Sequence, residues 1–126
     1  MAERPRILIA DDDAQVRTAV SRLLSPFCDV LGSVDDIRAL LDEVAKLRPD
    51  VVLLDFSLPG GLTGPEACQR LKREAPEVHV VALTGRDEAH LRKSAYEAGA
   101  SGFVWKMQAA TDLLPTIRSA IDRTTR

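Results

Sequence analysis

RPDVVLLDFSLPG, residues 48–60, sets a continuous apolar run between a proline and a turn-forming segment, with Asp55 at the end of the run. An alternating pattern would indicate a strand with one face in water, whereas VVLL is apolar at every position. Continuous runs of this kind are typical of strands in parallel sheets that helices cover on both sides. The stretch therefore predicts a buried parallel strand that ends in a carboxylate.

Similar short apolar runs recur along the chain and alternate with segments of helical periodicity. The predicted strands cover residues 6–10, 28–32, 51–55, 78–84 and 101–105. The predicted helices cover about 16–24, 37–44, 65–75, 88–98 and 113–121. Because strand–helix–strand crossovers are short and right-handed, this alternation predicts an α/β domain with an open, doubly wound, five-stranded parallel sheet and five helices.

Length and composition predict one domain over residues 1–126. The chain is 45% hydrophobic, enough for one core, and is too short for a second domain. Its 17 basic and 19 acidic residues are mixed, so no basic field favours nucleic acid or an anionic membrane. No apolar run reaches the length of a membrane span or of a signal-peptide core. We therefore expect a soluble protein in the cytoplasm.

Polar residues gather where the predicted strands end, which is where the ligand crevice of an open α/β sheet lies. They are Asp11, Asp12 and Asp13 after the first strand, Asp55 after the third, Thr84 after the fourth and Lys106 after the fifth. If the first and third strands are neighbours, their carboxylates converge and repel by about 4 kcal/mol at about 4 Å, for an effective dielectric near 20. Mg²⁺ or the Lys106 ammonium would offset that repulsion. This set is typical of phosphoryl transfer, in which an aspartate can be the nucleophile.

Four motifs in this order identify a resemblance to a known family. They are ILIADDD (7–13), RPDVVLLDFSLPG (48–60), VVALTG (80–85) and GASGFVWK (99–106). The chain resembles the receiver domain of bacterial two-component response regulators and is similar to the chemotaxis response regulator. The resemblance covers essentially the whole chain, and it implies a flavodoxin-like sheet with strand order 2-1-3-4-5.

The resemblance also implies a role for each strand-end residue. Asp55 would accept a phosphoryl group from a phosphohistidine on a sensor histidine kinase or a phosphotransfer protein. Asp12, Asp55 and the backbone carbonyl of Ser57 would bind Mg²⁺, with Asp11 acting through a metal-bound water. Lys106 would hold a phosphoryl oxygen or, before phosphorylation, the Asp55 carboxylate. The domain would be no enzyme beyond its own aspartyl phosphorylation and dephosphorylation.

The same resemblance implies a switch. Thr84 would move to hydrogen-bond the phosphoryl group, and Phe103 would swing inward behind it. The surface formed by the fourth helix, fifth strand and fifth helix would change and offer a face for a homodimer. The domain itself would contact neither nucleic acid nor membrane.

Three departures from the common family pattern are visible. Gly64 lies nine residues beyond Asp55 instead of eight, which indicates one extra residue in the 59–64 loop. Met107 follows Lys106 where many relatives have proline, so we expect no cis peptide there. Phe103 stands in place of a frequent tyrosine. The two positions that tune phosphoryl lifetime in the family hold Ser57 and Arg86, and Arg86 is expected to reach the phosphoryl group or an acidic neighbour.

Several residues have simpler interpretations. Asp13 precedes a helix and is expected to cap it. Phe103 fits an ordinary core aromatic as well as a switch, and Trp105 fits inward packing as well as a partner contact. No metal-binding or disulfide pattern is formed by the two histidines, His79 and His90, or by the two cysteines, Cys28 and Cys68.

Three alternative functions stay open on the sequence alone. Asp11-x-Asp13 mimics the acid pair of haloacid-dehalogenase-like phosphatases, although no second acidic pair follows. A receiver-like interaction domain without phosphorylation would share the fold. A flavodoxin-like cofactor carrier would share it too, but the chain lacks a Ser/Thr-rich phosphate loop after the first strand and has only five aromatic residues.

Overall fold

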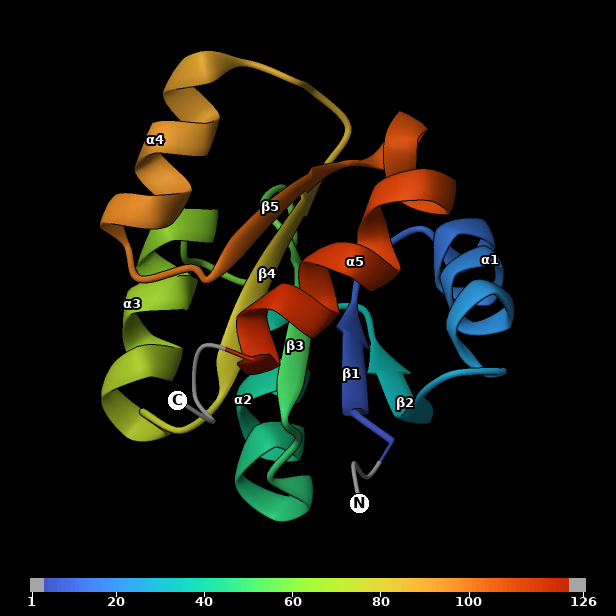
Figure 1. Ribbon diagram of the computed structural model, residues 1–126. Helices are drawn as coiled ribbons and strands as arrows, with labels where there is room; N and C mark the ends of the chain where they lie inside the picture. Colours follow the sequence, from blue (N-terminus) through green and yellow to red (C-terminus); the bar gives the residue numbers. More distant parts are fainter. Residues whose placement is uncertain (1–3, 123–126) are drawn as a thin grey trace.

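A computed structural model describes residues 4–122 of the chain. Five parallel strands form one sheet in the order β2-β1-β3-β4-β5 (Figure 1). The strands are β1 (Arg6–Ala10), β2 (Asp29–Val34), β3 (Val51–Asp55), β4 (His79–Thr84) and β5 (Gly102–Trp105). The predicted doubly wound sheet and its strand order are confirmed.

Five α-helices connect and cover these strands, as predicted. They are α1 (Ala14–Leu24), α2 (Ile37–Leu47), α3 (Gly64–Glu74), α4 (Ala89–Glu97) and α5 (Ala109–Asp122). A short 3₁₀ helix, η1 (Lys106–Gln108), joins β5 to α5 and was not predicted. In Figure 1, α5 crosses in front of the sheet and α2 lies behind it.

Two apolar cores form because successive residues of a strand point to opposite faces of the sheet. Ile7 and Ile9 of β1 pack with residues of α1 and α5, whereas Leu8 and Ala10 pack with residues of α2, α3 and α4. The four apolar residues of β3 divide between the cores in the same way, and all are fully buried. This explains why VVLL carries no polar position.

The second strand is the clearest difference from the prediction. Residues 28–32 were expected, and the strand instead runs from Asp29 to Val34. The two residues beyond the predicted end are Ser33, which is polar, and Val34, and both continue the ladder because β1 pairs with them as far as Ala10↔Val34. A bulge between Ile7 and Leu8 shifts the register. Pairing with a neighbour extends this strand beyond its apolar run.

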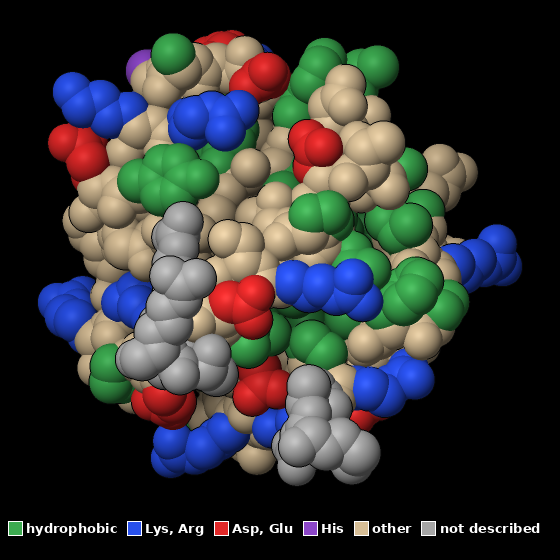
Figure 2. Space-filling model, viewed as in Figure 1, with side chains coloured by type: hydrophobic (Ala, Val, Ile, Leu, Met, Phe, Trp, Pro, Cys, Tyr) green, Lys and Arg blue, Asp and Glu red, His purple; other side chains and the backbone are tan. Residues whose placement is uncertain are grey.

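The surface carries mixed charge. On the face shown in Figure 2, Lys and Arg side chains are interspersed with Asp and Glu side chains. This face therefore shows no single-sign field of the kind that binds nucleic acid. None of the described helices combines the length and apolar character that crossing a membrane requires.

Candidate functional site

Three carboxylates converge at the carboxyl end of the central strands. Ala10 of β1 pairs with Leu54 of β3, so the next residues of the two strands, Asp11 and Asp55, lie side by side. Both are buried, with 0% and 1% of their surface exposed, whereas Asp12 is exposed. One carboxylate oxygen from each of the three lies within 4.8 Å of the others. The predicted convergence is therefore present.

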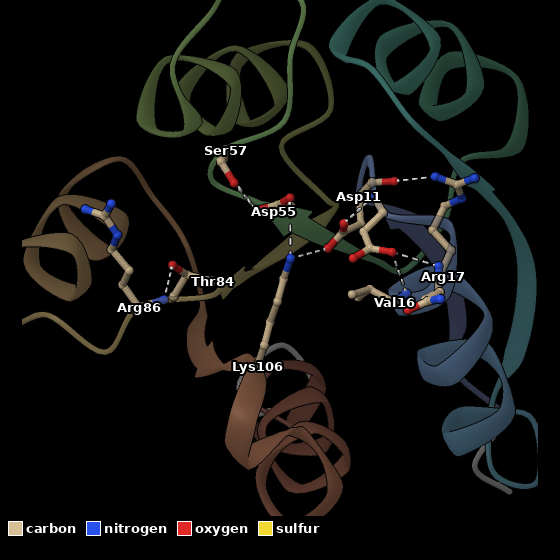
Figure 3. A network of polar contacts seen from close by, with 10 residues as sticks. Asp11, Val16, Arg17, Asp55, Ser57, Thr84, Arg86 and Lys106 are labelled. Carbon is tan, nitrogen blue, oxygen red and sulfur yellow. Dashed lines mark hydrogen bonds and ion pairs between the residues drawn. The ribbon is translucent and has the colours of Figure 1, made fainter.

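Lys106 lies between the two buried carboxylates (Figure 3). Its Nζ is 2.6 Å from Asp11 Oδ2 and 3.5 Å from Asp55 Oδ2. Burial disfavours the ammonium charge, but the contact with Asp11 and the negative charges of both carboxylates outweigh burial and raise the pKa of Lys106. Lys106 is thus a charged partner of the site rather than a solvated surface lysine.

Asp55 is held in a fixed orientation. Its Oδ1 accepts hydrogen bonds from the Ser57 backbone N–H at 3.0 Å and from the Ser57 hydroxyl at 2.9 Å, which leaves Oδ2 towards Lys106. Burial raises the pKa of Asp55, although the Ser57 N–H and the Lys106 charge act in the opposite direction. One oxygen of Asp55 is therefore anchored and the other faces the cation.

The hydroxyl contact of Ser57 was not predicted, since only its backbone carbonyl was considered. A serine two residues after a strand-end aspartate is typical of a local turn in which the aspartate side chain accepts from the backbone. That pattern could have indicated the contact between Ser57 and Asp55.

The acidic cluster fits a hard divalent cation. Three carboxylates face one ammonium, so the ionised cluster carries excess negative charge. Asp11 Oδ2 and Asp55 Oδ2 are buried, and neither accepts a well-formed hydrogen bond within residues 4–122. Oxygen donors of this kind are what Mg²⁺ and Ca²⁺ prefer. Asp11, Asp12 and Asp55 could therefore hold a metal ion.

Asp13 has a separate role at the start of α1. Its Oδ1 accepts from the backbone N–H groups of Gln15 at 2.8 Å and Val16 at 3.4 Å. The predicted helix cap is confirmed. Because the Asp13 carboxylate is engaged in capping, the Asp11-x-Asp13 pair lacks the free acid that a haloacid-dehalogenase-like phosphatase would need.

Thr84 ends β4 and lies on the other side of Lys106 from Asp11 in Figure 3. Only 5% of its surface is exposed, and its hydroxyl oxygen accepts the Arg86 backbone N–H at 3.2 Å. The Arg86 guanidinium points instead to Glu88, at 3.6 Å. Of the two partners expected for Arg86, this conformation shows the acidic neighbour.

Phe103 and Trp105 divide between core and surface. Phe103 is 6% exposed and packs in the core that α3 and α4 share, with the Arg92 guanidinium 4.6 Å from its ring centroid. Trp105 is partly exposed, and its indole N–H donates to the Gly85 carbonyl at 3.2 Å. Phe103 is a core residue in this conformation, and Trp105 joins β5 to the loop after Thr84.

The loop with the extra residue is shaped by its glycines. Gly60 and Gly61 have φ of 134° and 90°, a region that favours glycine. Gly64 begins α3 directly against Phe56, where an added Cβ would lie 2.4 Å from the ring carbon Cγ. Close packing thus requires glycine at position 64.

The peptide bond between Lys106 and Met107 is expected to be trans. No peptide bond among the described residues is cis, that bond included.

The remaining reactive side chains lie outside the site. Cys28 and Cys68 are buried free thiols, and burial raises the pKa of Cys68 to about 11. His79 Nδ1 is 3.2 Å from the Ser101 hydroxyl, and His90 lies at the surface, 3.3 Å from Glu88. His79 begins β4 and His90 is exposed on α4.

A doubly wound sheet with an acidic cluster, a lysine and a threonine at one edge defines a phosphoacceptor signalling module. The chain belongs to the response regulator receiver domain family, whose model matches residues 7–118. Phosphorylation-dependent two-component signalling is the general function of this family. This membership favours the receiver interpretation over the cofactor-carrier and phosphatase alternatives.

Relatives and solved structures agree with this assignment. Response regulator GacA of Pseudomonas viridiflava is 35% identical over 90% of this chain and 53% of the relative. Response regulator MprA of Mycolicibacterium vanbaalenii is 37% identical over 95% and 52%. The RcsB response regulator of Salmonella typhimurium is 26% identical with a TM-score of 0.87, over 98% of this chain and 62% of that one. A LuxR-family response regulator from Aurantimonas sp. SI85-9A1 is 27% identical with a TM-score of 0.88, over 95% and 86%. The chain spans about half the length of the relatives GacA and MprA.

Proposed function

We propose that Asp55 is the residue of this receiver that is phosphorylated. The observation that carries the proposal is the fixed Asp55 carboxylate, with Oδ1 bound by Ser57 and Oδ2 facing Lys106. An Asp55 oxygen would attack the phosphorus of a phosphohistidine on a sensor kinase or phosphotransfer protein. The new O–P bond forms as the P–N bond breaks, and the imidazole leaves and takes a proton. Lys106 supports this step because its charge favours the ionised carboxylate.

The proposal includes a Mg²⁺ ion held by Asp12, Asp55 and the Ser57 carbonyl, with Asp11 acting through water. When bound, the cation would neutralise charge on the phosphoryl oxygens. The chain's own residues orient the reacting groups: Ser57 holds the Asp55 carboxylate, and Lys106 holds one side of the site. The chemistry takes place on the protein's own side chain, so the domain is a substrate of the transfer rather than an enzyme with turnover.

We further propose that phosphorylation changes the surface formed by α4, β5 and α5. The Thr84 hydroxyl accepts a backbone N–H from Arg86, and that contact would be replaced when Thr84 turns to the phosphoryl group. Because Phe103 is already inward, the change at this position would be a shift in its contact with Arg92 rather than a swing from solvent. A local charge change would thereby alter a distant surface.

The partners follow from the same chemistry. A phosphohistidine donor in the cytoplasm would supply the phosphoryl group. The RcsB response regulator of Salmonella typhimurium interacts with DNA, which is a property of that protein. For the present domain, we propose that any effect on DNA is indirect, since the face in Figure 2 has mixed charge.

Incubation with Mg²⁺ and a small acyl phosphate tests the proposal. Wild-type protein is expected to gain one acid-labile phosphoryl group by mass spectrometry, and Asp55→Asn is expected to gain none. Asp42→Asn, which changes an exposed aspartate on α2, serves as the matched control and should react like wild type.

Two other results would support different functions. Absence of phosphate uptake by the folded wild type, with either the acyl phosphate or a phosphohistidine donor, would favour an interaction domain without phosphorylation. Turnover of a phosphomonoester that Asp11→Asn abolishes and Asp55→Asn does not would favour a phosphatase.

A further inference from the structure

We propose that Arg17, on α1, is a positioning residue that sets the direction of the Asp12 carboxylate towards a bound divalent cation. This inference rests on the proposed metal site. It assigns to Arg17 a function that its place in the sequence does not indicate, because Arg17 lies beyond the acidic triplet on a helix that also carries another arginine.

Asp12 differs from the other two carboxylates of the cluster in lacking side-chain support. Asp11 contacts Lys106 and the Asp13 backbone, and Asp55 contacts Lys106 and Ser57. The Asp12 carboxylate is exposed and has no hydrogen bond or ion pair within the part of the chain that the structure describes. Its direction therefore depends on the two peptide groups that flank it.

Both flanking peptide groups are held by specific contacts. The Asp11 carbonyl, in the peptide before Asp12, accepts a hydrogen bond from Arg17 Nη1 at 2.8 Å. The Asp13 N–H, in the peptide after Asp12, donates to Asp11 Oδ1 at 2.9 Å. The backbone of Asp12 is thus fixed on one side by Asp11 itself and on the other side by Arg17.

Arg17 suits this task for two reasons. It is half-buried on the first turns of α1, and its own N–H donates to the Asp13 carbonyl at 3.0 Å, so the helix is joined to the same turn. Its guanidinium is planar and always charged, and a charged donor makes a stronger and more directional hydrogen bond than a neutral one. The contact can therefore restrict the peptide plane before Asp12.

Positioning and charge predict opposite effects of removing Arg17, which makes the inference testable. A positive charge near the cluster opposes cation binding, so loss of the charge alone would tighten Mg²⁺ binding. Loss of the hydrogen bond would instead free the Asp11–Asp12 peptide and weaken Mg²⁺ binding. The sign of the change in affinity distinguishes the two.

The experiment is a Mg²⁺ titration of the unphosphorylated protein, followed by calorimetry and by emission of Trp105, the single tryptophan, which precedes Lys106. Arg17→Met is expected to raise the Mg²⁺ dissociation constant about tenfold, at the lower end of the loss seen when a group that orients a metal ligand is removed. Arg17→Lys, which keeps the charge, should fall between Arg17→Met and wild type. Arg22→Met, an exposed arginine on the same helix, should bind like wild type.

A second measurement separates positioning from general damage to the fold. The rate of phosphorylation by an acyl phosphate should fall in Arg17→Met at low Mg²⁺ and return close to the wild-type rate at saturating Mg²⁺. Equal or tighter Mg²⁺ binding by folded Arg17→Met, with wild-type binding intact, would overturn the inference alone. Absence of Mg²⁺ binding by the wild type would overturn the proposed metal site and the inference together. If Arg17→Met does not fold, the comparison of Arg17→Lys with wild type decides, and equal affinity overturns the inference.

Discussion

The role proposed for Asp55 places opposing demands on its carboxyl group. A nucleophilic carboxylate has to be ionised, but burial raises its pKa. Ser57 and Lys106 offset part of that effect, so the site keeps an ionisable group where water is largely excluded. This balance has a consequence for stability as well as for reactivity.

The pH dependence of stability follows from the direction of the Asp55 shift. In the unfolded chain the carboxyl titrates near its ordinary value, about 3.9. Between that value and the raised pKa of the folded state, the folded state binds more protons, so stability falls as pH rises. Asp55→Asn is therefore expected to unfold at a higher temperature than wild type at pH 7 without Mg²⁺. The difference should disappear below about pH 3.9.

Thermal unfolding measured by circular dichroism across pH checks this prediction. Asp42→Asn is the control, because its exposed carboxylate is not part of the cluster. A wild type that melts at or above the temperature of Asp55→Asn at pH 7 would contradict it.

The set of side chains at strand ends was predictable from the sequence, and side-chain contacts with backbone carbonyls of the loops were not. Apolar runs are followed by the site residues Asp11, Asp12, Asp55, Thr84 and Lys106. The carboxyl ends of parallel strands meet at one edge of the sheet. The Arg17 guanidinium and the Trp105 indole reach backbone carbonyls only through particular helix and loop geometries. The Ser57–Asp55 contact, in contrast, follows a local turn pattern. Hydrophobic periodicity indicates which faces of helices and strands are buried, but it gives no information on such contacts.

At the scale of elements, the loop between β3 and α3, which follows Asp55 directly, is held by several specific contacts. The start of α3 is closed by a capping box between Thr63 and Glu66. Just inside it, Gly64 meets Phe56, and the Pro59 carbonyl accepts the Ile37 N–H at 2.9 Å, which joins the loop to α2. The extra residue is thus accommodated by glycines and backbone contacts.

Gly64→Ala is expected to lower the free energy of unfolding by about 1–3 kcal/mol, the usual range for overpacking. The added methyl would overlap the Phe56 ring unless α3 or the ring moves. Gly32→Ala is the matched control, since an added Cβ there meets no atom within 4 Å. Urea denaturation measures both variants.

A double variant makes the test specific. Phe56→Ala removes the overlapping ring, so adding Gly64→Ala to it should cause a smaller loss than adding Gly64→Ala to wild type. Equal losses in the two backgrounds would show that contact with Phe56 is not the reason for glycine at this position.

At the scale of the whole molecule, exposed aromatic side chains lie on opposite flanks of α5. Tyr96 on α4 is 46% exposed and lines a groove with Arg92, Phe103 and residues of α5. Phe27, after α1, is 49% exposed, with the Arg118 guanidinium 5.8 Å from its ring centroid. Large exposed aromatics are common at protein interfaces, so both flanks are candidates for association.

We expect phosphorylation to favour a homodimer through the Tyr96 flank, because this flank contains the α4–β5–α5 surface. Sedimentation velocity should show a dimer only after treatment with Mg²⁺ and an acyl phosphate. Tyr96→Ser should prevent the dimer without reducing phosphate uptake, and Phe27→Ser should leave it intact. The reverse pattern would assign the interface to the α1–α5 side, and a monomer in all cases would contradict dimer formation.

Sequence alone was enough for the class of fold, the strand order that the family resemblance implied and the set of strand-end residues. The physical reason is local: apolar periodicity reflects burial, and parallel strands bring their carboxyl ends together. Tertiary structure decided the length of β2, the inward position of Phe103, the anchoring of Asp55 by Ser57 and the contact of Arg17 with Asp11. The length of β2 and the position of Phe103 depend on pairing and packing with other segments. The Ser57 and Arg17 contacts are local in sequence, but they depend on the exact geometry of the turns that follow β3 and β1. The acidic triplet after β1 shows both contributions. The sequence predicted that Asp13 caps a helix, whereas only the folded chain shows that Asp11 is buried against Lys106 and that Asp12 is exposed.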